Sequence, residues 1–79
     1  MDTAVVRETI INMLPDFGMA STDPNWETAL IADGRYLGRR FEFDCLRVYW
    51  IWEHNTLEFY NDDWVLIGER KLQERAVAA

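Results

Sequence analysis

The stretch from Arg39 to Ile67 most constrains what this chain can fold into, because most of its large apolar residues sit two positions apart. Short polar clusters interrupt the alternation at Asp44-Cys45, at 54–56 and at 61–63. A period of two places apolar side chains on one face of a strand, and Asn and Asp favour tight turns between strands. The pattern predicts an antiparallel meander, in which each strand pairs with the next along the chain.

The turn signals set the limits of the strands that we expect within residues 36–68. About four strands follow from them: Leu37–Phe43, Leu46–Glu53, Leu57–Tyr60 and Trp64–Ile67. Gly68 then ends the sheet or allows a bulge, because glycine weakens a strand interior. Residues 69–79 are charged and then rich in alanine, and we expect a tail that is either a fraying helix or disordered.

Residues 3–14 carry the clearest helical pattern. Apolar residues recur there at spacings of three and four positions: Val6, Ile10, Met13 and Leu14. Asp2 or Thr3 can cap the start. Pro15 disfavours the helical conformation of the residue before it, so the helix should end near Leu14. We expect this helix to pack on one face of the sheet, although its wide apolar stripe also allows a dimer contact.

Residues 15–35 read as a loop that contains one ambiguous short element, Trp26–Ala32. Asp23-Pro24 resembles a helix start, and Gly34 would then end a short helix. Asp33-Gly34 is equally a strong hairpin-turn signal, which would make Trp26–Ala32 a strand. The capping residues favour the helix slightly, and the strand is the alternative. Together, these elements predict a single small α+β domain that spans residues 1–79.

Composition narrows the classes of function and the compartment. The chain carries 14 acidic and 8 basic residues, for a formal net charge of −6, which disfavours binding to a nucleic-acid backbone. Its single cysteine, Cys45, cannot form an internal disulfide. No run approaches the roughly 18 apolar residues of a membrane-spanning helix, and no secretory signal is visible. We therefore expect a cytoplasmic protein that binds neither nucleic acid nor membranes.

Residue types that carry catalysis or bind metals are present only in isolation. His54 is the only histidine, and Glu53 precedes it, but no second metal ligand or nucleophile stands at a useful spacing. The triplet Asn61-Asp62-Asp63 fits a turn better than a calcium loop. The sequence therefore predicts no catalytic residue, no metal and no cofactor, and we expect a protein that is not an enzyme.

The arginines and tryptophans also have structural interpretations. Arg35, Arg39 and Arg40 are more simply explained by ion pairs with cross-strand acids, such as Glu53 or Glu58, than by contacts with RNA. We expect most of the 4 tryptophans to lie in the core, because a small domain needs large side chains. An exposed tryptophan would mark a binding site.

The best hint of function lies in the second expected strand, Leu46–Glu53. One of its faces is wholly apolar, and the other still carries Tyr49 and Ile51. One short helix is too narrow to cover both faces of a sheet, so a face with Tyr49, Ile51 and Tyr60 should remain open. We expect this face to bind a protein partner or a second copy of the chain, which makes the protein an interaction or regulatory module.

Two alternatives come from other classes of function. A small-molecule binder or minor enzyme would use a pocket between helix and sheet, and a cluster of Arg39, Glu53 and His54 would favour it. An acidic mimic that inhibits a nucleic-acid-binding protein would need a contiguous acidic surface.

Overall fold

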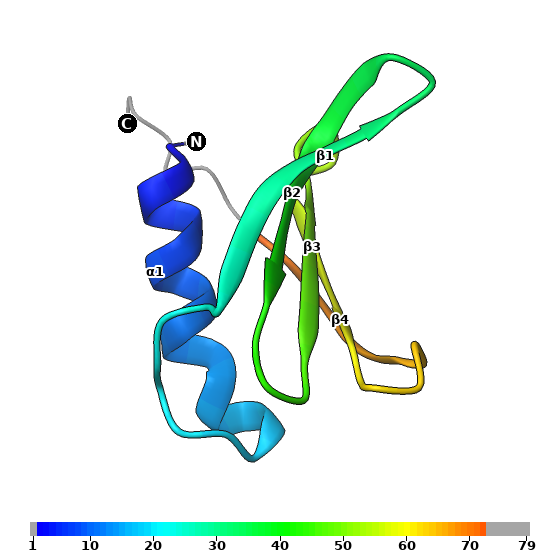
Figure 1. Ribbon diagram of the computed structural model, residues 1–79. Coiled ribbons are helices and arrows are strands. Elements are labelled where there is room, and N and C mark those ends of the chain that lie inside the picture. The colour runs from blue at the N-terminus through cyan, green and yellow to red at the C-terminus, as the bar shows by residue number, and fades with distance from the viewer. Residues whose placement is uncertain (1, 73–79) are drawn as a thin grey trace.

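The computed structural model describes residues 2–72, which form a helix followed by one antiparallel sheet. Helix α1 (Thr3–Met13) continues into a 3-10 turn, η1 (Leu14–Phe17). The strands are β1 (Trp26–Ala32), β2 (Arg35–Glu42), β3 (Arg47–Ile51), β4 (Thr56–Tyr60) and β5 (Leu66–Lys71). Each strand pairs antiparallel with the next, in the order β1-β2-β3-β4-β5, and α1 lies against one side of the sheet (Figure 1). The predicted α+β fold is confirmed, with five strands in the described residues instead of about four.

Helix α1 begins and ends where the sequence indicates. The side chain of Asp2 accepts a hydrogen bond from the backbone N–H of Ala4 at 3.1 Å, which caps the first turn. After Met13 the chain tightens into η1, where Pro15 stands in the first turn. Gly18 then adopts the left-handed conformation, with φ 81°, and its N–H donates to the carbonyls of Leu14 and Pro15 at the start of η1.

The helix that we slightly favoured for Trp26–Ala32 is wrong, because this segment is strand β1. Asp33 and Gly34 both have positive φ, 54° and 75°, which is the geometry of a two-residue hairpin turn. The turn brings β1 back along β2, so its backbone groups gain an entire ladder of partners. A helix of two turns would gain only local hydrogen bonds, and such a short helix is marginal on its own.

The end of the sheet also differs from the expectation. Strand β5 begins at Leu66 instead of Trp64 and continues to Lys71, so residues 69–71 are not a tail. Trp64 instead lies in the turn before β5, with φ 61°. Gly68 lies inside β5. Glycine fits this position because a Cβ would lie only 2.6 Å from the ring of Phe17. Residues 73–79 of the expected tail lie outside the described residues.

The core lies between α1 and the near face of the sheet. Val6, Ile10 and Leu14 are fully buried against the side chains that alternate inward from the central strands. Those strand residues are Phe41, Val48, Trp50, Leu57 and Phe59. Each aliphatic side chain buried here contributes roughly 1.5–3 kcal/mol to folding. The expected packing of the helix on one face of the sheet is therefore present.

Close approach of β2 and β3 makes Gly38 a sensitive position. A Cβ there would lie 1.7 Å from the carbonyl oxygen of Trp50. We expect Gly38→Ala to lower the free energy of unfolding by about 3 kcal/mol or more, since the two strands must separate to admit the methyl group. Urea denaturation followed by tryptophan fluorescence measures the loss.

Gly34→Ala is the matched control for this prediction. Its φ is 75°, but no heavy atom lies within 4 Å of the added Cβ. The cost should be only the left-handed conformation of an L-residue, about 1–2 kcal/mol. Equal losses in the two variants would show that strand proximity at Gly38 is not the limiting contact.

Candidate functional site

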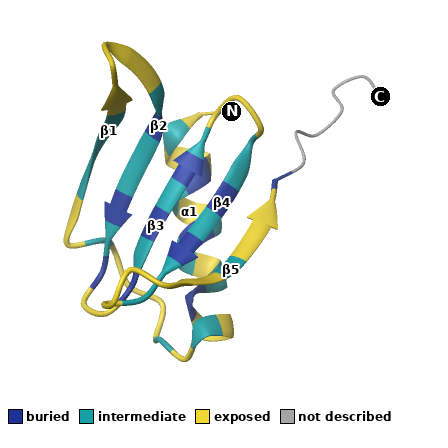
Figure 2. Cartoon of the chain, turned by 90° about the vertical axis from the view of Figure 1, so that its right-hand side faces the viewer, coloured by how far each residue is buried: buried dark blue, intermediate teal, exposed yellow. Residues whose placement is uncertain are grey.

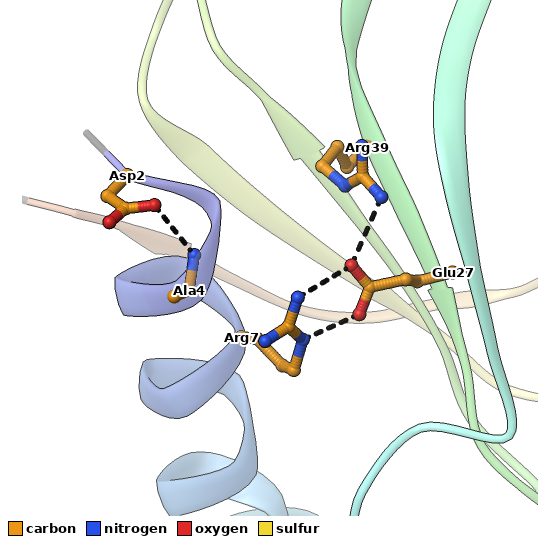
Figure 3. Close-up of polar contacts among 5 residues, drawn as sticks. All are labelled: Asp2, Ala4, Arg7, Glu27 and Arg39. Atoms are coloured by element: carbon orange, nitrogen blue, oxygen red, sulfur yellow. Dashed lines mark hydrogen bonds and ion pairs between the residues drawn. The ribbon is translucent and has the colours of Figure 1, made fainter.

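A cluster of charged side chains joins α1 to the edge of the sheet at β1 and β2 (Figure 3). The Glu27 carboxylate accepts hydrogen bonds from Arg7 Nε at 2.6 Å and Arg7 Nη2 at 3.0 Å. It also accepts one from Arg39 Nη2 at 3.1 Å. The hydrogen bonds from Arg7 lower the pKa of Glu27, burial opposes them, and Arg39 adds to the effect. Because both carboxylate oxygens accept from arginines of this chain, one on the helix and one on the sheet, the cluster fixes the helix on the sheet.

The depressed pKa of Glu27 predicts a dependence of stability on pH. Its contribution is present above the ordinary glutamate pKa of 4.5 and is lost as the pH falls through the lower folded-state value. Thermal unfolding of Glu27→Gln should therefore change less with acidification below this pH than that of the wild type. Glu53→Gln is the control, since its pair with Arg35 is long, 3.9 Å, and exposed. Parallel acid profiles for wild type and Glu27→Gln would contradict the anchoring role.

The structure does not bring together the residues that would have favoured a pocket between helix and sheet. Arg39 points to the helix side and binds Glu27. Glu53 pairs with Arg35 near the exposed tip of the β1–β2 hairpin. His54 lies in the turn after β3 and lines a different surface. The ion pairs that we expected between arginines and cross-strand acids are present for Arg35 and Arg39. Arg40 differs, because it pairs with Glu42 of its own strand at 3.4 Å.

The second surface is the sheet face turned away from α1, which faces the viewer in Figure 2. Among residues 2–72, no helix or strand packs on it. Strand alternation and register place three rows of side chains across this surface, which we call the open face. From β1 to β5, the rows are Trp26–Glu42–Arg47–Tyr60–Leu66, Thr28–Arg40–Tyr49–Glu58–Glu69 and Leu30–Gly38–Ile51–Thr56–Lys71.

Aromatic rings gather on the open face over β3 and β4. Tyr49 lies 5.4 Å from Tyr60 and 6.1 Å from Trp64, measured between ring centroids. The guanidinium of Arg47 stacks on Trp64 at 4.6 Å and pairs with Asp62 at 3.3 Å. These contacts form one connected group in which aromatic rings alternate with charges.

A similar unit stands on the β1 side of the open face. Arg40 lies 4.9 Å above the ring of Trp26 and also pairs with Glu42.

The three residues that we predicted to bind a partner, Tyr49, Ile51 and Tyr60, all lie on this face, each partly exposed. Whether they bind a partner stays a prediction.

Most tryptophans are not in the core, which corrects our expectation. Only Trp50 is buried, at 6% exposure, whereas Trp26, Trp52 and Trp64 are 50%, 51% and 50% exposed. Trp52 donates a hydrogen bond to the Tyr36 carbonyl near the tip of the β1–β2 hairpin. Trp26 and Trp64 border the open face, and sequence reasoning missed both. The available signal was the position of Trp64 directly after an Asp-Asp turn.

A shallow hollow of about 300 Å³ indents one corner of the open face. Its walls come from β3, β4, β5 and the turn after β3: Ile51, His54, Thr56, Glu58, Glu69 and Lys71. Glu58 and Glu69 stand directly opposite each other in the β4–β5 register. Within residues 2–72, no three His, Cys, Asp or Glu side chains are grouped to hold a metal ion. The hollow therefore offers mixed charges beside an apolar residue, which suits a protein surface better than a buried catalytic site.

Tyr60 and Glu58 provide a spectroscopic probe of the open face. The Tyr60 hydroxyl donates to the Glu58 carboxylate at 2.8 Å, and this bond, with burial, raises the pKa of Tyr60 to about 12. Glu58→Gln should shift the Tyr60 titration toward the ordinary value of 10.0. Ultraviolet absorbance titration measures the shift, with Tyr60→Phe to assign the signal. The associated stability should be present below pH 10 and lost between about 10 and 12. An unchanged titration in Glu58→Gln would contradict this hydrogen bond.

Comparisons with models of protein families, with curated proteins and with solved structures found no match for the chain. Within the described residues, no helix has the length and apolar content to cross a membrane.

Proposed function

We propose that this protein is a non-enzymatic interaction module that binds a protein partner through the open face of its sheet. The observation that carries the proposal is the cluster of exposed and partly exposed aromatic rings, Tyr49, Tyr60 and Trp64, on a face that no described element covers. Tyrosine, tryptophan and arginine are the residues that dominate binding energy at protein interfaces. Their concentration on one side of a small domain is typical of a contact surface.

The contacts that hold the side chains of this surface in place support the same proposal. Tyr49 and Tyr60 project from neighbouring strands of a paired ladder, and Arg47 and Trp64 hold each other by stacking. Side chains that are already ordered lose less conformational entropy when they bind. A partner would therefore meet a surface with its main contact groups in place.

The alternatives have weaker support. A small-molecule site would rest on the shallow hollow beside His54, which encloses little of a ligand. An acidic mimic would need a contiguous acidic surface. The open face instead alternates Arg40, Arg47 and Lys71 with Glu42, Glu58 and Glu69.

The test compares proteins captured from the source cells by three immobilised forms of the full chain. Ile51→Glu introduces a charge into the open face, where Ile51 stands opposite Gly38 and Thr56 and no carboxylate is directly across. Val5→Glu makes the same kind of change at an exposed position of α1, away from the open face. We expect wild type and Val5→Glu to retain the same protein partners, and Ile51→Glu to lose them by at least about tenfold.

Circular dichroism and thermal unfolding establish that all three forms are folded before the captured proteins are compared by quantitative mass spectrometry. Partner sets that do not differ between Ile51→Glu and Val5→Glu would rule out the open face as the binding surface. Loss of the same partners from Val5→Glu would instead place the contact on α1.

A further inference from the structure

We propose that the open face pairs with the open face of a second copy of this chain, around a twofold axis that runs along β3. This inference rests on the proposed function and names its partner. In this arrangement the two sheets stack face to face, with β2 of one copy over β4 of the other and β1 over β5. The argument depends on the order of side chains in each row of the open face.

The middle row of the open face is complementary to itself when it is reversed. It reads Thr28, Arg40, Tyr49, Glu58, Glu69 from β1 to β5. A twofold axis along β3 sets each residue against the one at the mirrored strand position. Arg40 of each copy then faces Glu58 of the other, and Tyr49 faces its own counterpart. Two ion pairs therefore flank an aromatic contact, and they add to the partners that Arg40 and Glu58 already have within each copy, Glu42 and Tyr60.

Two positions of the outer rows add apolar contacts in the same arrangement, and the remaining positions pair polar or charged residues with the residues at the mirrored positions of the row. Trp26 on β1, 50% exposed, faces Leu66 on β5, which is 49% exposed. Trp64, two residues before Leu66, packs against Arg47 and Tyr49 on the same face. Ile51 meets its counterpart on the axis. Arg47 also meets its counterpart there, but Asp62 pairs with each Arg47 and offsets the repulsion.

The other simple twofold arrangement is electrostatically unfavourable. A twofold axis perpendicular to the strands sets each strand against the same strand of the second copy. Each residue of the middle row then faces the same residue of the other copy. Arg40 would then face Arg40, and Glu58 would face Glu58. Like charges opposed across an interface cost free energy and select against a wrong geometry. Charge therefore distinguishes the two orientations.

The charge balance of the open face permits a second copy to approach. The chain as a whole carries −6. The open face and its rim hold three basic side chains, Arg40, Arg47 and Lys71, against four acidic ones, Glu42, Glu58, Asp62 and Glu69. The difference, −1, leaves most of the acidic excess elsewhere on the molecule. Two identical faces meet with little net repulsion, whereas other surfaces of the two copies repel each other.

The size of the face predicts a weak dimer. Five strands about 4.8 Å apart and five residues at about 3.3 Å give a face of roughly 24 by 17 Å. A face-to-face pair then buries about 800 Å² in total, which is at the low end of the range of weak, reversible complexes. We expect a dissociation constant of about 10–100 µM. Stacked sheets rotate by about 30° relative to each other, so the pairings should hold best near the axis, at the middle row.

Sedimentation equilibrium of the full chain tests the inference with a charge exchange. Arg40→Glu and Glu58→Arg each place like charges across the axis, and each should weaken the dimer by about tenfold or more. The double variant, Arg40→Glu with Glu58→Arg, recreates the opposite-charge pairs in reverse and should return to within about threefold of wild type. Arg35→Glu is the control for altered charge, because Arg35 lies near the hairpin tip, and it should leave the dimer constant unchanged. Near-ultraviolet circular dichroism verifies that every variant keeps its fold.

The outcomes separate this inference from the proposed function. Concentration-dependent dimers with rescue in the double variant support the face-to-face pair along β3. Dimers that the single substitutions do not weaken, or that the double variant does not rescue, overturn it. A wild type that stays monomeric at about 500 µM, well above the expected dissociation constant, also overturns it. If face-dependent capture of another protein persists in that case, the interaction module stands and its partner is not a second copy.

Discussion

One short helix has to cover a sheet that is wider than the helix, and the rest of the structure depends on this constraint. Helix α1 has 11 residues, about 16 Å of length, and a helix with its side chains is about 10 Å wide. Five strands span about 24 Å. Val6, Ile10 and Leu14 can therefore seal the middle of one face and nothing beyond it. The apolar core forms where helix and central strands meet, and the opposite face has no described cover.

The flanks of the covered face are completed by long side chains instead of aliphatic ones. At β1 and β2, Glu27 binds Arg7 from the helix and Arg39 from the sheet. At β4 and β5, the Phe17 ring stacks on Phe59 at 4.3 Å, and the Arg70 guanidinium lies over Phe17. Gly68 makes room for that ring. These contacts cover the parts of the sheet face on both sides of α1. Amphipathic side chains can do this because they bury their apolar stems while their charged ends remain paired or hydrated.

The open face combines exposed aromatic rings with charged side chains, which limit nonspecific aggregation. Arg40 lies over Trp26 and Arg47 over Trp64, so the exposed rings are flanked by cations. Tyr49 lies at the centre of this arrangement. It was notable in the sequence because β3 carries more apolar residues than a strand with one solvent-exposed face usually does. The sequence carried one signal for the exposure of the two tryptophans, the Asp-Asp turn before Trp64, since burial depends on what the other elements leave uncovered. Edge strand β5 ends in charged residues, which discourages indiscriminate strand pairing.

The sequence by itself determined the elements whose signals are local. Helix α1 follows from apolar spacing and its Asp2 cap, and the meander from β2 to β4 follows from alternation between polar turns. Only the tertiary structure decided that Trp26–Ala32 is a strand, because the local signals conflicted: Asp23-Pro24 indicated a helix and Asp33-Gly34 a hairpin. Pairing with β2 decides between them. The extension of β5 past Gly68 has the same origin, since Phe17 fills the space beside that glycine from a distant part of the chain. Local patterns fix which conformations are available, and contacts between distant segments select among them.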